Sequence, residues 1–112
     1  MSDTPVLDTA VLDDLVEHIG VDAVRAIIEI FLGECRELTA AMTVSPNPAE
    51  ARRAAHSLKS SAGQLGAAAL AEAALAVELA ADRNSPELRE CIAALMACAA
   101  ATEPALAARL AG

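Results

Sequence analysis

One stretch of the chain carries its larger apolar residues at a strict helical spacing. Between residues 22 and 42 the intervals are four, three, four, three and four, at positions Val24, Ile28, Phe31, Cys35, Leu38 and Met42. Residues at these intervals lie along one side of an α-helix, which is typical of a helix packed lengthwise in a bundle. The spacing therefore predicts a helix over about 22–42 with one buried face.

Capping residues and apolar spacing predict four further helices, over about residues 8–19, 47–65, 67–82 and 86–102. Pro104 is expected to kink or interrupt the last helix near Thr102, leaving residues 105–110 as a final turn or two. Because the connections are short, including a tight turn at residues 44–47, neighbouring helices should be antiparallel. The predicted fold class is all-α: an antiparallel four-helix bundle with a short additional N-terminal helix packed across one end.

The composition indicates how such a bundle is packed. Hydrophobic residues make up 55% of the chain, but many are alanine, and Phe31 is the single aromatic residue. The core must therefore be formed by closely approaching helices rather than by large side chains. We expect one domain over residues 1–112, with residues 1–7 as a flexible arm and with Leu75 and Leu79 widening the apolar stripe of the fourth helix.

The charge and the cysteine content indicate which class of partner and which cellular compartment to expect. The net charge of −8 and the pI near 4.5 argue against nucleic acid or an anionic membrane surface as the partner, and favour proteins. The cysteines show no metal-ligand spacing, and residues 1–8 do not resemble a signal peptide. No apolar run approaches the roughly 18 residues of a membrane span. We therefore expect a cytoplasmic protein.

The predicted third helix presents a histidine away from its apolar side. Asn47 is its predicted N-cap, Pro48 its first residue and Gly66 its stop. At about 100° per residue, His56 lies nearly opposite Leu58 and Leu65, so burial of the leucines turns the imidazole outward. The stripe around it consists of Arg52, His56, Ser60 and Gly63, with Arg53 and Lys59 at its edges.

This arrangement favours phosphoryl acceptance by His56. Three of the eight basic residues, Arg52, Arg53 and Lys59, fall within eight positions, so the stripe is locally positive in a negative chain. Ser60 and Gly63 leave an uncrowded approach to the ring. An exposed nucleophilic nitrogen with a nearby cation suits a histidine that accepts a phosphoryl group.

At these residues the chain resembles the histidine-containing phosphotransfer (HPt) domains of bacterial two-component phosphorelays. Their hallmark is His-x-Leu-Lys-Gly, followed by small residues and a hydrophobic residue paired with glycine. Here the segment reads His56-Ser57-Leu58-Lys59-Ser60-Ser61-Ala62-Gly63-Gln64-Leu65-Gly66. Ser60 stands where the family usually has glycine; its hydroxyl can bond back to the carbonyl of His56, so this departure is expected to be tolerated.

The resemblance implies a role for each residue of this segment. His56 would be the phosphoacceptor, and Lys59 would stabilise the charge of the phosphoryl group. Partner-binding residues would be Arg52, Arg53, Ser60, Gly63 and Gln64. The structural residues of the motif would be Leu58, Leu65 and Gly66.

The resemblance also implies partners and cofactors. Phosphoryl groups would pass between aspartates of the receiver domains of a hybrid histidine kinase and of a response regulator. The chain itself would bind no metal and no cofactor, and Mg²⁺ would be held by the partner receiver. It has no Gly-rich phosphate loop, so autophosphorylation from ATP is not expected, and the resemblance implies that the chain would be a phosphocarrier rather than an enzyme. A monomer is expected.

Three alternatives remain beside this interpretation. An isolated exposed histidine is commonly an ordinary surface residue, although the joint spacing of Lys59, Leu65 and Gly66 counts against that. A metal or haem site using His18 and His56 would lack matching acidic or cysteine ligands. The third alternative is an HPt-fold interaction module that regulates a kinase or receiver without phosphotransfer, which Ser60 leaves open.

Overall fold

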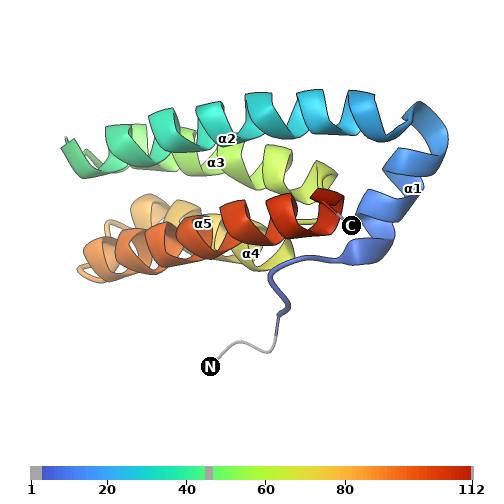
Figure 1. The fold of residues 1–112 in the computed structure, drawn as a ribbon. Helices are drawn as coiled ribbons and strands as arrows, with labels where there is room; N and C mark the ends of the chain where they lie inside the picture. Colours follow the sequence, from blue (N-terminus) through green and yellow to red (C-terminus); the bar gives the residue numbers. More distant parts are fainter. Residues whose placement is uncertain (1–3, 45–46, 112) are drawn as a thin grey trace.

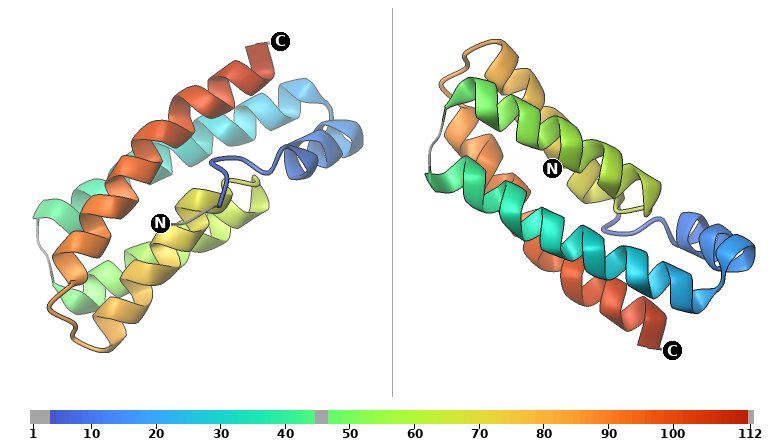
Figure 2. Two further views of the ribbon diagram at one scale, coloured as in Figure 1. Left: turned by 90° about the horizontal axis from the view of Figure 1, so that it is seen from below. Right: turned by 90° about the horizontal axis from the view of Figure 1, so that it is seen from above.

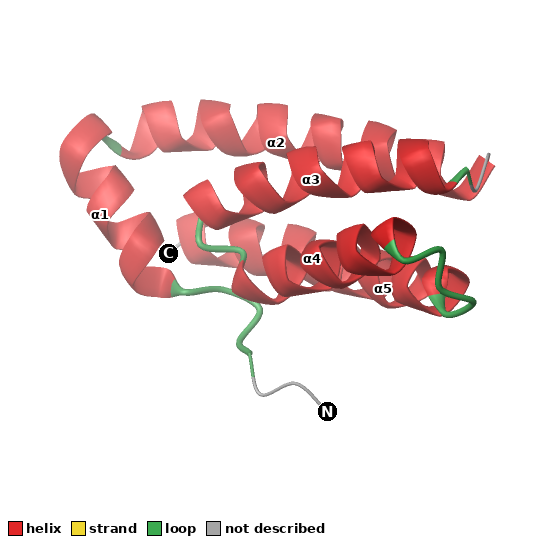
Figure 3. Cartoon of the chain, turned by 180° about the vertical axis from the view of Figure 1, so that it is seen from behind, coloured by secondary structure: helices red, strands yellow, loops and turns green. Residues whose placement is uncertain are grey.

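The computed structural model describes residues 4–44 and 47–111, and these form five helices. Their bounds are α1 Thr9–Ile19, α2 Val21–Val44, α3 Pro48–Gln64, α4 Ala68–Asp82 and α5 Leu88–Ala111. Helices α2 to α5 run alongside one another as an antiparallel bundle, and α1 crosses one end of it (Figure 1). The described residues contain helices and loops but no strand (Figure 3). The predicted all-α bundle is therefore confirmed.

The capping residues define most helix boundaries as predicted. The Asp8 carboxylate accepts a hydrogen bond from the Ala10 N–H, and α1 ends at Gly20. Ser85 Oγ accepts one from the Glu87 N–H at 3.1 Å, although regular α-helix begins only at Leu88. Residues 45–46 of the predicted tight turn lie outside the described residues.

Alanine fills much of the core, as the composition predicts. α3 makes its most extensive contact with α4, and four alanines of these two helices are completely buried: Ala51, Ala55, Ala62 and Ala74. Larger side chains complete the core, and those buried to 1% exposure or less are Leu12, Val24, Met42, Leu58, Leu70, Val77, Leu95 and Leu106. The seam of α2 is buried apart from Leu38, which is partly buried.

Two apolar residues of α4 do not join the core. Leu75 and Leu79 were expected to widen the buried stripe, but they are 40% and 41% exposed. They lie on the outer side of the helix because α4 faces α3 and α5 through Leu70, Ala74, Val77 and Ala81, all of which are buried.

Pro104 does not interrupt α5, so the expected break near Thr102 is wrong. The helix continues to Ala111. Proline removes one helical hydrogen bond, at a cost of about 3 kcal/mol, but Ala100, which loses its N–H partner, is exposed and accessible to water. Beyond the proline, Leu106 is fully buried and Arg109 pairs with Asp13 of α1. These tertiary contacts hold the helix together across the proline.

Helix α5 is also long and apolar enough to cross a membrane by length and composition alone, contrary to the sequence expectation. In the fold it is the fourth helix of the bundle. Leu88, Ile92, Leu95 and Leu106 are buried in the shared core.

The described part of the N-terminal arm, residues 4–7, is anchored rather than loose. The carbonyl of Pro5 accepts a hydrogen bond from the Ala69 N–H at 3.0 Å, and Thr4 bonds to Glu72 of α4. The adjacent Asp8 N–H donates to the Gly66 carbonyl at 2.6 Å. The arm therefore joins α1 to the connection between α3 and α4.

Gly66 is constrained at this junction in two ways. Its φ of 76° lies in the left-handed region, which favours glycine. A Cβ built there would lie 2.6 Å from the Asp8 carbonyl oxygen and 2.9 Å from the Val11 Cβ. By contrast, a Cβ at Gly63 would meet nothing within 4 Å, and Gly63 lies within helix α3.

Gly66→Ala should therefore lower the free energy of unfolding by about 2–3 kcal/mol, from backbone strain and the clash with α1. Gly63→Ala is the matched control, and it should be neutral or stabilising by up to about 1 kcal/mol because alanine favours helix. Urea unfolding of both variants measures the difference. Equal stabilities would contradict the tight junction at Gly66.

Candidate functional site

Helix α3 holds His56 on the outer surface of the bundle. The helix begins as predicted, since Asn47 Oδ1 accepts hydrogen bonds from the N–H groups of Ala49 at 2.9 Å and Glu50 at 3.4 Å. Leu58 and Leu65 are buried on the core side. The His56 side chain is 62% exposed, so the imidazole is accessible to a partner molecule.

The structure adds a carboxylate that sequence reasoning missed. Glu78, on α4, has one oxygen 2.7 Å from His56 Nδ1, while its other oxygen accepts a hydrogen bond from Lys59 Nζ at 2.8 Å. The Glu78 side chain is only 11% exposed. The three residues form a polar cluster, here called the His56–Glu78–Lys59 cluster, which joins α3 to α4.

This contact fixes which ring nitrogen of His56 is free. A carboxylate only accepts hydrogen bonds, so the imidazole must donate to it through a protonated Nδ1. In the neutral ring the proton is then on Nδ1, and Nε2 keeps its lone pair on the opposite side of the ring. The cluster thus presents a nucleophilic Nε2 at the surface.

The two donors also keep Glu78 ionised. Both hydrogen bonds lower the pKa of Glu78 below its ordinary value of 4.5; the one from Lys59 has the larger effect and the one from His56 the smaller. Each of them outweighs burial, which acts in the opposite direction. Glu78 is therefore a carboxylate at neutral pH, and its negative charge is held directly beside the imidazole.

Other ion pairs reduce the positive charge predicted for this face. Lys59 faces Glu78, and Arg52 Nε lies 3.3 Å from the Asp82 carboxylate at the end of α4. Arg53 is exposed and forms no ion pair among the described residues. Two of the three predicted cations are thus paired with α4, and one is left facing solvent.

The remaining residues of the motif divide between surface and core. Ser60, Gly63 and Gln64 are exposed, whereas Gly66 is buried at the junction with α1. Within residues 4–44 and 47–111, Ser60 Oγ makes no hydrogen bond to the His56 carbonyl. The hydroxyl is left available at the surface.

A signal for Glu78 does exist in the sequence. It follows Ala74 by four residues and precedes Ala81 by three, which places it on the buried stripe of α4. A carboxylate on a buried stripe needs a charged or hydrogen-bonding partner. The sequence alone does not show which neighbouring helix supplies that partner.

His18 and His56 do not meet in one site. His18 Nδ1 lies 2.7 Å from the carbonyl oxygen of Asp14 on its own helix, while His56 contacts Glu78. In the part of the chain that the structure describes, no group of three or more His, Cys, Asp or Glu residues is placed to hold a metal ion.

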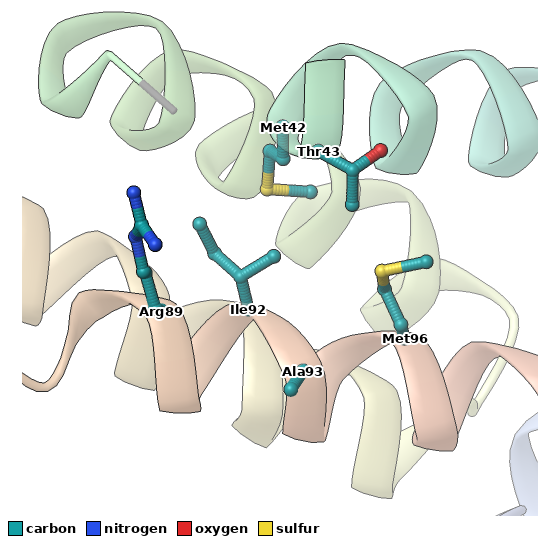
Figure 4. A pocket seen from close by; sticks show the side chains of 6 residues that line it. All are labelled: Met42, Thr43, Arg89, Ile92, Ala93 and Met96. Atoms are coloured by element: carbon teal, nitrogen blue, oxygen red, sulfur yellow. The ribbon is translucent and has the colours of Figure 1, made fainter. Parts of the chain in front are cut away.

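A surface groove lies away from this cluster. It has a volume of about 430 Å³ between the C-terminal end of α2 and the N-terminal part of α5 (Figure 4). Its lining residues are Met42, Thr43, Arg89, Ile92, Ala93 and Met96. None belongs to α3 or α4, and the lining offers no nucleophile with an adjacent base, so the groove is separate from the His56–Glu78–Lys59 cluster.

The lowered pKa of Glu78 predicts a pH-dependent stability. Because the folded pKa lies below the unfolded one, the stabilisation is present above about pH 4.5 and is lost as the pH falls through the folded pKa. The difference in unfolding free energy between the wild type and Glu78→Gln should therefore be largest near neutral pH and shrink in acid. Urea unfolding at several pH values measures it, with Glu90→Gln on α5 as the control. A difference that stays constant with pH would contradict the ionised Glu78.

Comparison with known proteins agrees with this geometry. The family model described as the Hpt domain matches residues 26–108, which is more than half of the chain and includes the whole cluster. No curated protein and no solved structure gave a match. Hpt domains are phosphocarrier modules that serve histidine phosphotransfer and interact with receiver or kinase domains in two-component systems. The fold, the motif on α3 and the family match together show that the chain belongs to the Hpt domain family.

Proposed function

We propose that the chain relays a phosphoryl group between aspartates of two receiver domains, through phosphohistidine at Nε2 of His56. The observation that carries this proposal is the 2.7 Å contact between His56 Nδ1 and Glu78, on a ring that is 62% exposed. It combines a defined tautomer with an accessible nucleophile.

In the first transfer, the Nε2 lone pair attacks the phosphorus of an aspartyl phosphate on the donor receiver. The N–P bond forms, the P–O bond to the aspartate breaks, and the aspartate leaves as a carboxylate. Nδ1 keeps its proton, so the ring becomes positively charged, and that charge lies directly against Glu78. Glu78 therefore stabilises the charge that develops on the ring as the N–P bond forms.

The second transfer reverses these steps. A carboxylate of the acceptor receiver attacks the phosphorus, and the N–P bond breaks with its electron pair returning to Nε2. The neutral ring with its proton on Nδ1 is restored without any net proton transfer. A carrier of this kind needs no base of its own, which fits a cluster where the carboxylate only accepts the Nδ1 proton in a hydrogen bond.

Lys59 would supply charge to the phosphoryl oxygens. Its ammonium group has three N–H donors, and the contact with Glu78 uses one. The others remain for a phosphoryl group on His56, one helical turn away. Arg53 is the cation of this face that forms no ion pair among the described residues, and Arg52 becomes available when its contact with Asp82 opens.

The partner receiver domains would supply the phosphoryl group and the metal ion. The chain has no nucleotide-binding motif, so the phosphoryl group would come from a receiver rather than from ATP, and the receiver would hold the Mg²⁺. We further propose that the protein acts as a monomer in the cytoplasm. The three cysteines, Cys35, Cys91 and Cys98, are free, which is consistent with a reducing compartment.

Replacement of His56 tests this function directly. Incubation with a panel of phosphorylated receiver domains should place acid-labile, base-stable label on the wild type but none on His56→Gln. His18→Gln is a matched control, because His18 is the other histidine and lies on α1 away from the cluster. It should be labelled as the wild type is.

Label on His56→Gln would contradict the assignment of the phosphoacceptor. If no receiver labels a wild-type protein that circular dichroism shows to be folded, phosphotransfer itself fails. The interaction module without phosphotransfer then becomes the better account.

Glu78→Gln tests the role of the carboxylate. The amide removes the negative charge, and its N–H₂ group can donate to Nδ1 and so favour the wrong tautomer. Loss of a charge-assisted hydrogen bond should slow transfer from a receiver about 10- to 100-fold. The ¹⁵N chemical shifts of His56 should also show a smaller fraction with the proton on Nδ1. Glu90→Gln is the control, and unchanged rates and shifts in Glu78→Gln would show that Glu78 has no positioning role.

A further inference from the structure

Helix α5 carries a second row of evenly spaced residues, beside the buried ones that join the core. The intervals along it are four, three, four, three and four, and its members are Arg89, Ala93, Met96, Ala100, Glu103 and Ala107. Met96 is 40% exposed, and Arg89 and the three alanines are exposed as well. Such spacing is typical of a helix that packs lengthwise against another helix, yet this row faces solvent.

The row borders three connected grooves between α5 and α2. The first, drawn in Figure 4, includes Met96; the second shares Met96 and reaches Glu103; the third shares Glu103 and includes Ala107. Their volumes are about 430, 180 and 430 Å³. Because α5 contacts α2 less extensively than it contacts α4, a continuous hollow is left between α2 residues 25–43 and α5 residues 89–110. It is here called the α2–α5 furrow.

The furrow is nearly neutral although the chain is acidic. Its charged lining residues are three arginines and two glutamates, whereas the whole chain has a net charge of −8: Arg25, Arg36, Arg89, Glu29 and Glu103. Two copies of so acidic a protein repel each other where their carboxylates meet. The furrow is a face on which that repulsion is small.

The order of the charges along the row fits a second copy of the same helix. Arg89 precedes Met96 by seven residues, and Glu103 follows Met96 by seven. In a two-fold contact between antiparallel helices centred on Met96, Arg89 of each copy therefore faces Glu103 of the other. Arg89 forms no ion pair within residues 4–44 and 47–111. Glu103 pairs with Arg36 across the furrow through one oxygen, so its other oxygen can accept a hydrogen bond from a second arginine.

We propose that the α2–α5 furrow is a self-association face, covered by helix α5 of a second copy of this chain that runs antiparallel to the first. Met96 lies on the two-fold axis, and the Met96 side chain of each copy enters the furrow of the other. Ala93 and Ala100 allow the two backbones to approach closely. Two symmetric pairs of Arg89 with Glu103 fix the direction and the register of the contact.

The size of the face predicts a weak dimer. The row from Arg89 to Ala107 is about 27 Å long at 1.5 Å per residue. Packed helices lie about 8–10 Å apart, so α2 and α5 together present a face about 20 Å wide. About 500 Å² is then buried on each copy, which is at the small end of protein interfaces, where contacts are transient. The dimer therefore forms at high protein concentration, and the monomer prevails in dilute solution.

This contact leaves the reactive histidine accessible. In Figure 1 helices α2 and α5 lie in front, with α3 and α4 behind them, and Figure 2 shows the same arrangement from above. The contact between His56 and Glu78 joins α3 to α4, so it lies on the side of the bundle opposite the furrow. Each copy keeps its own exposed imidazole, and the inference does not depend on the proposed phosphorelay function.

The exposed leucines of α4 are less suited to a second copy. Leu75 and Leu79 are 40% and 41% exposed. An antiparallel two-fold contact centred between them would place Glu72 of each copy against Asp82 of the other. Like charges would then face each other at both ends of the contact, which disfavours it.

Charge reversal tests the proposed contact. Arg89→Glu places a carboxylate against Glu103 of the other copy, and Glu103→Arg places a guanidinium against Arg89. The dissociation constant of each variant alone should be about tenfold higher than that of the wild type. An equimolar mixture of the two variants should recover the wild-type affinity, because each new charge then faces its opposite. Sedimentation velocity from micromolar to millimolar protein measures the dimer fraction.

Two further variants test the apolar part of the contact. Met96→Gln changes the side chain on the two-fold axis and should weaken the dimer about tenfold. Leu79→Gln is the matched control, because Leu79 is 41% exposed and Met96 is 40% exposed. It should dimerise as the wild type does. Circular dichroism of each variant checks that the helices are retained.

Three results would overturn the inference. The first is a wild-type chain that stays monomeric up to millimolar concentration. The second is a dimer that Leu79→Gln weakens while Arg89→Glu and Met96→Gln leave it unchanged. The third is a mixture of folded Arg89→Glu and Glu103→Arg that dimerises no better than either variant alone.

Discussion

A nearly buried carboxylate joins the two helices that matter most for this protein. Glu78 lies on α4 with both oxygens occupied by donors from α3, His56 Nδ1 and Lys59 Nζ. A charge removed from water is tolerated only where such partners compensate it, so the register of α4 against α3 is tied to this cluster. The same cluster that links α4 to α3 also fixes the tautomer of the imidazole. The contact between α3 and α4 and the proposed reactivity therefore depend on one interaction.

Small side chains make that interaction possible. Helices α3 and α4, which make the most extensive helix contact, bury small alanines such as Ala51, Ala55 and Ala74, and small residues allow helix backbones to approach closely. Glu78 then reaches both His56 and Lys59 while remaining only 11% exposed. Larger side chains, among them Phe31, Leu58 and Leu70, fill the rest of the core. The alanine-rich composition is thus linked to the chemistry of the surface as well as to the fold.

Much of the fold could be predicted from local signals. The four-three spacing along α2, the caps at Asp8 and Asn47 and the stop at Gly66 each act within one or two turns, so the sequence shows them directly. The outward position of His56 follows from its angle to Leu58 in the same way. Pro104 was misjudged because its local cost is outweighed by contacts with other helices, such as the burial of Leu106 and the pairing of Arg109 with Asp13. The exposure of Leu79 was missed for a similar reason, since it depends on which side of α4 meets its neighbours.

The sequence by itself determined the helices, the exposed histidine and the residues available to the reactive face, because periodicity and capping are properties of short segments. Only the tertiary structure decided what each of those residues contacts. It turned Lys59 toward Glu78, paired Arg52 with Asp82, and left Met96 exposed beside the furrow between α2 and α5. These outcomes depend on the rotation and register of whole helices against one another. Helix rotation and register are set by the packing of the entire core, and no single stretch of sequence carries that information.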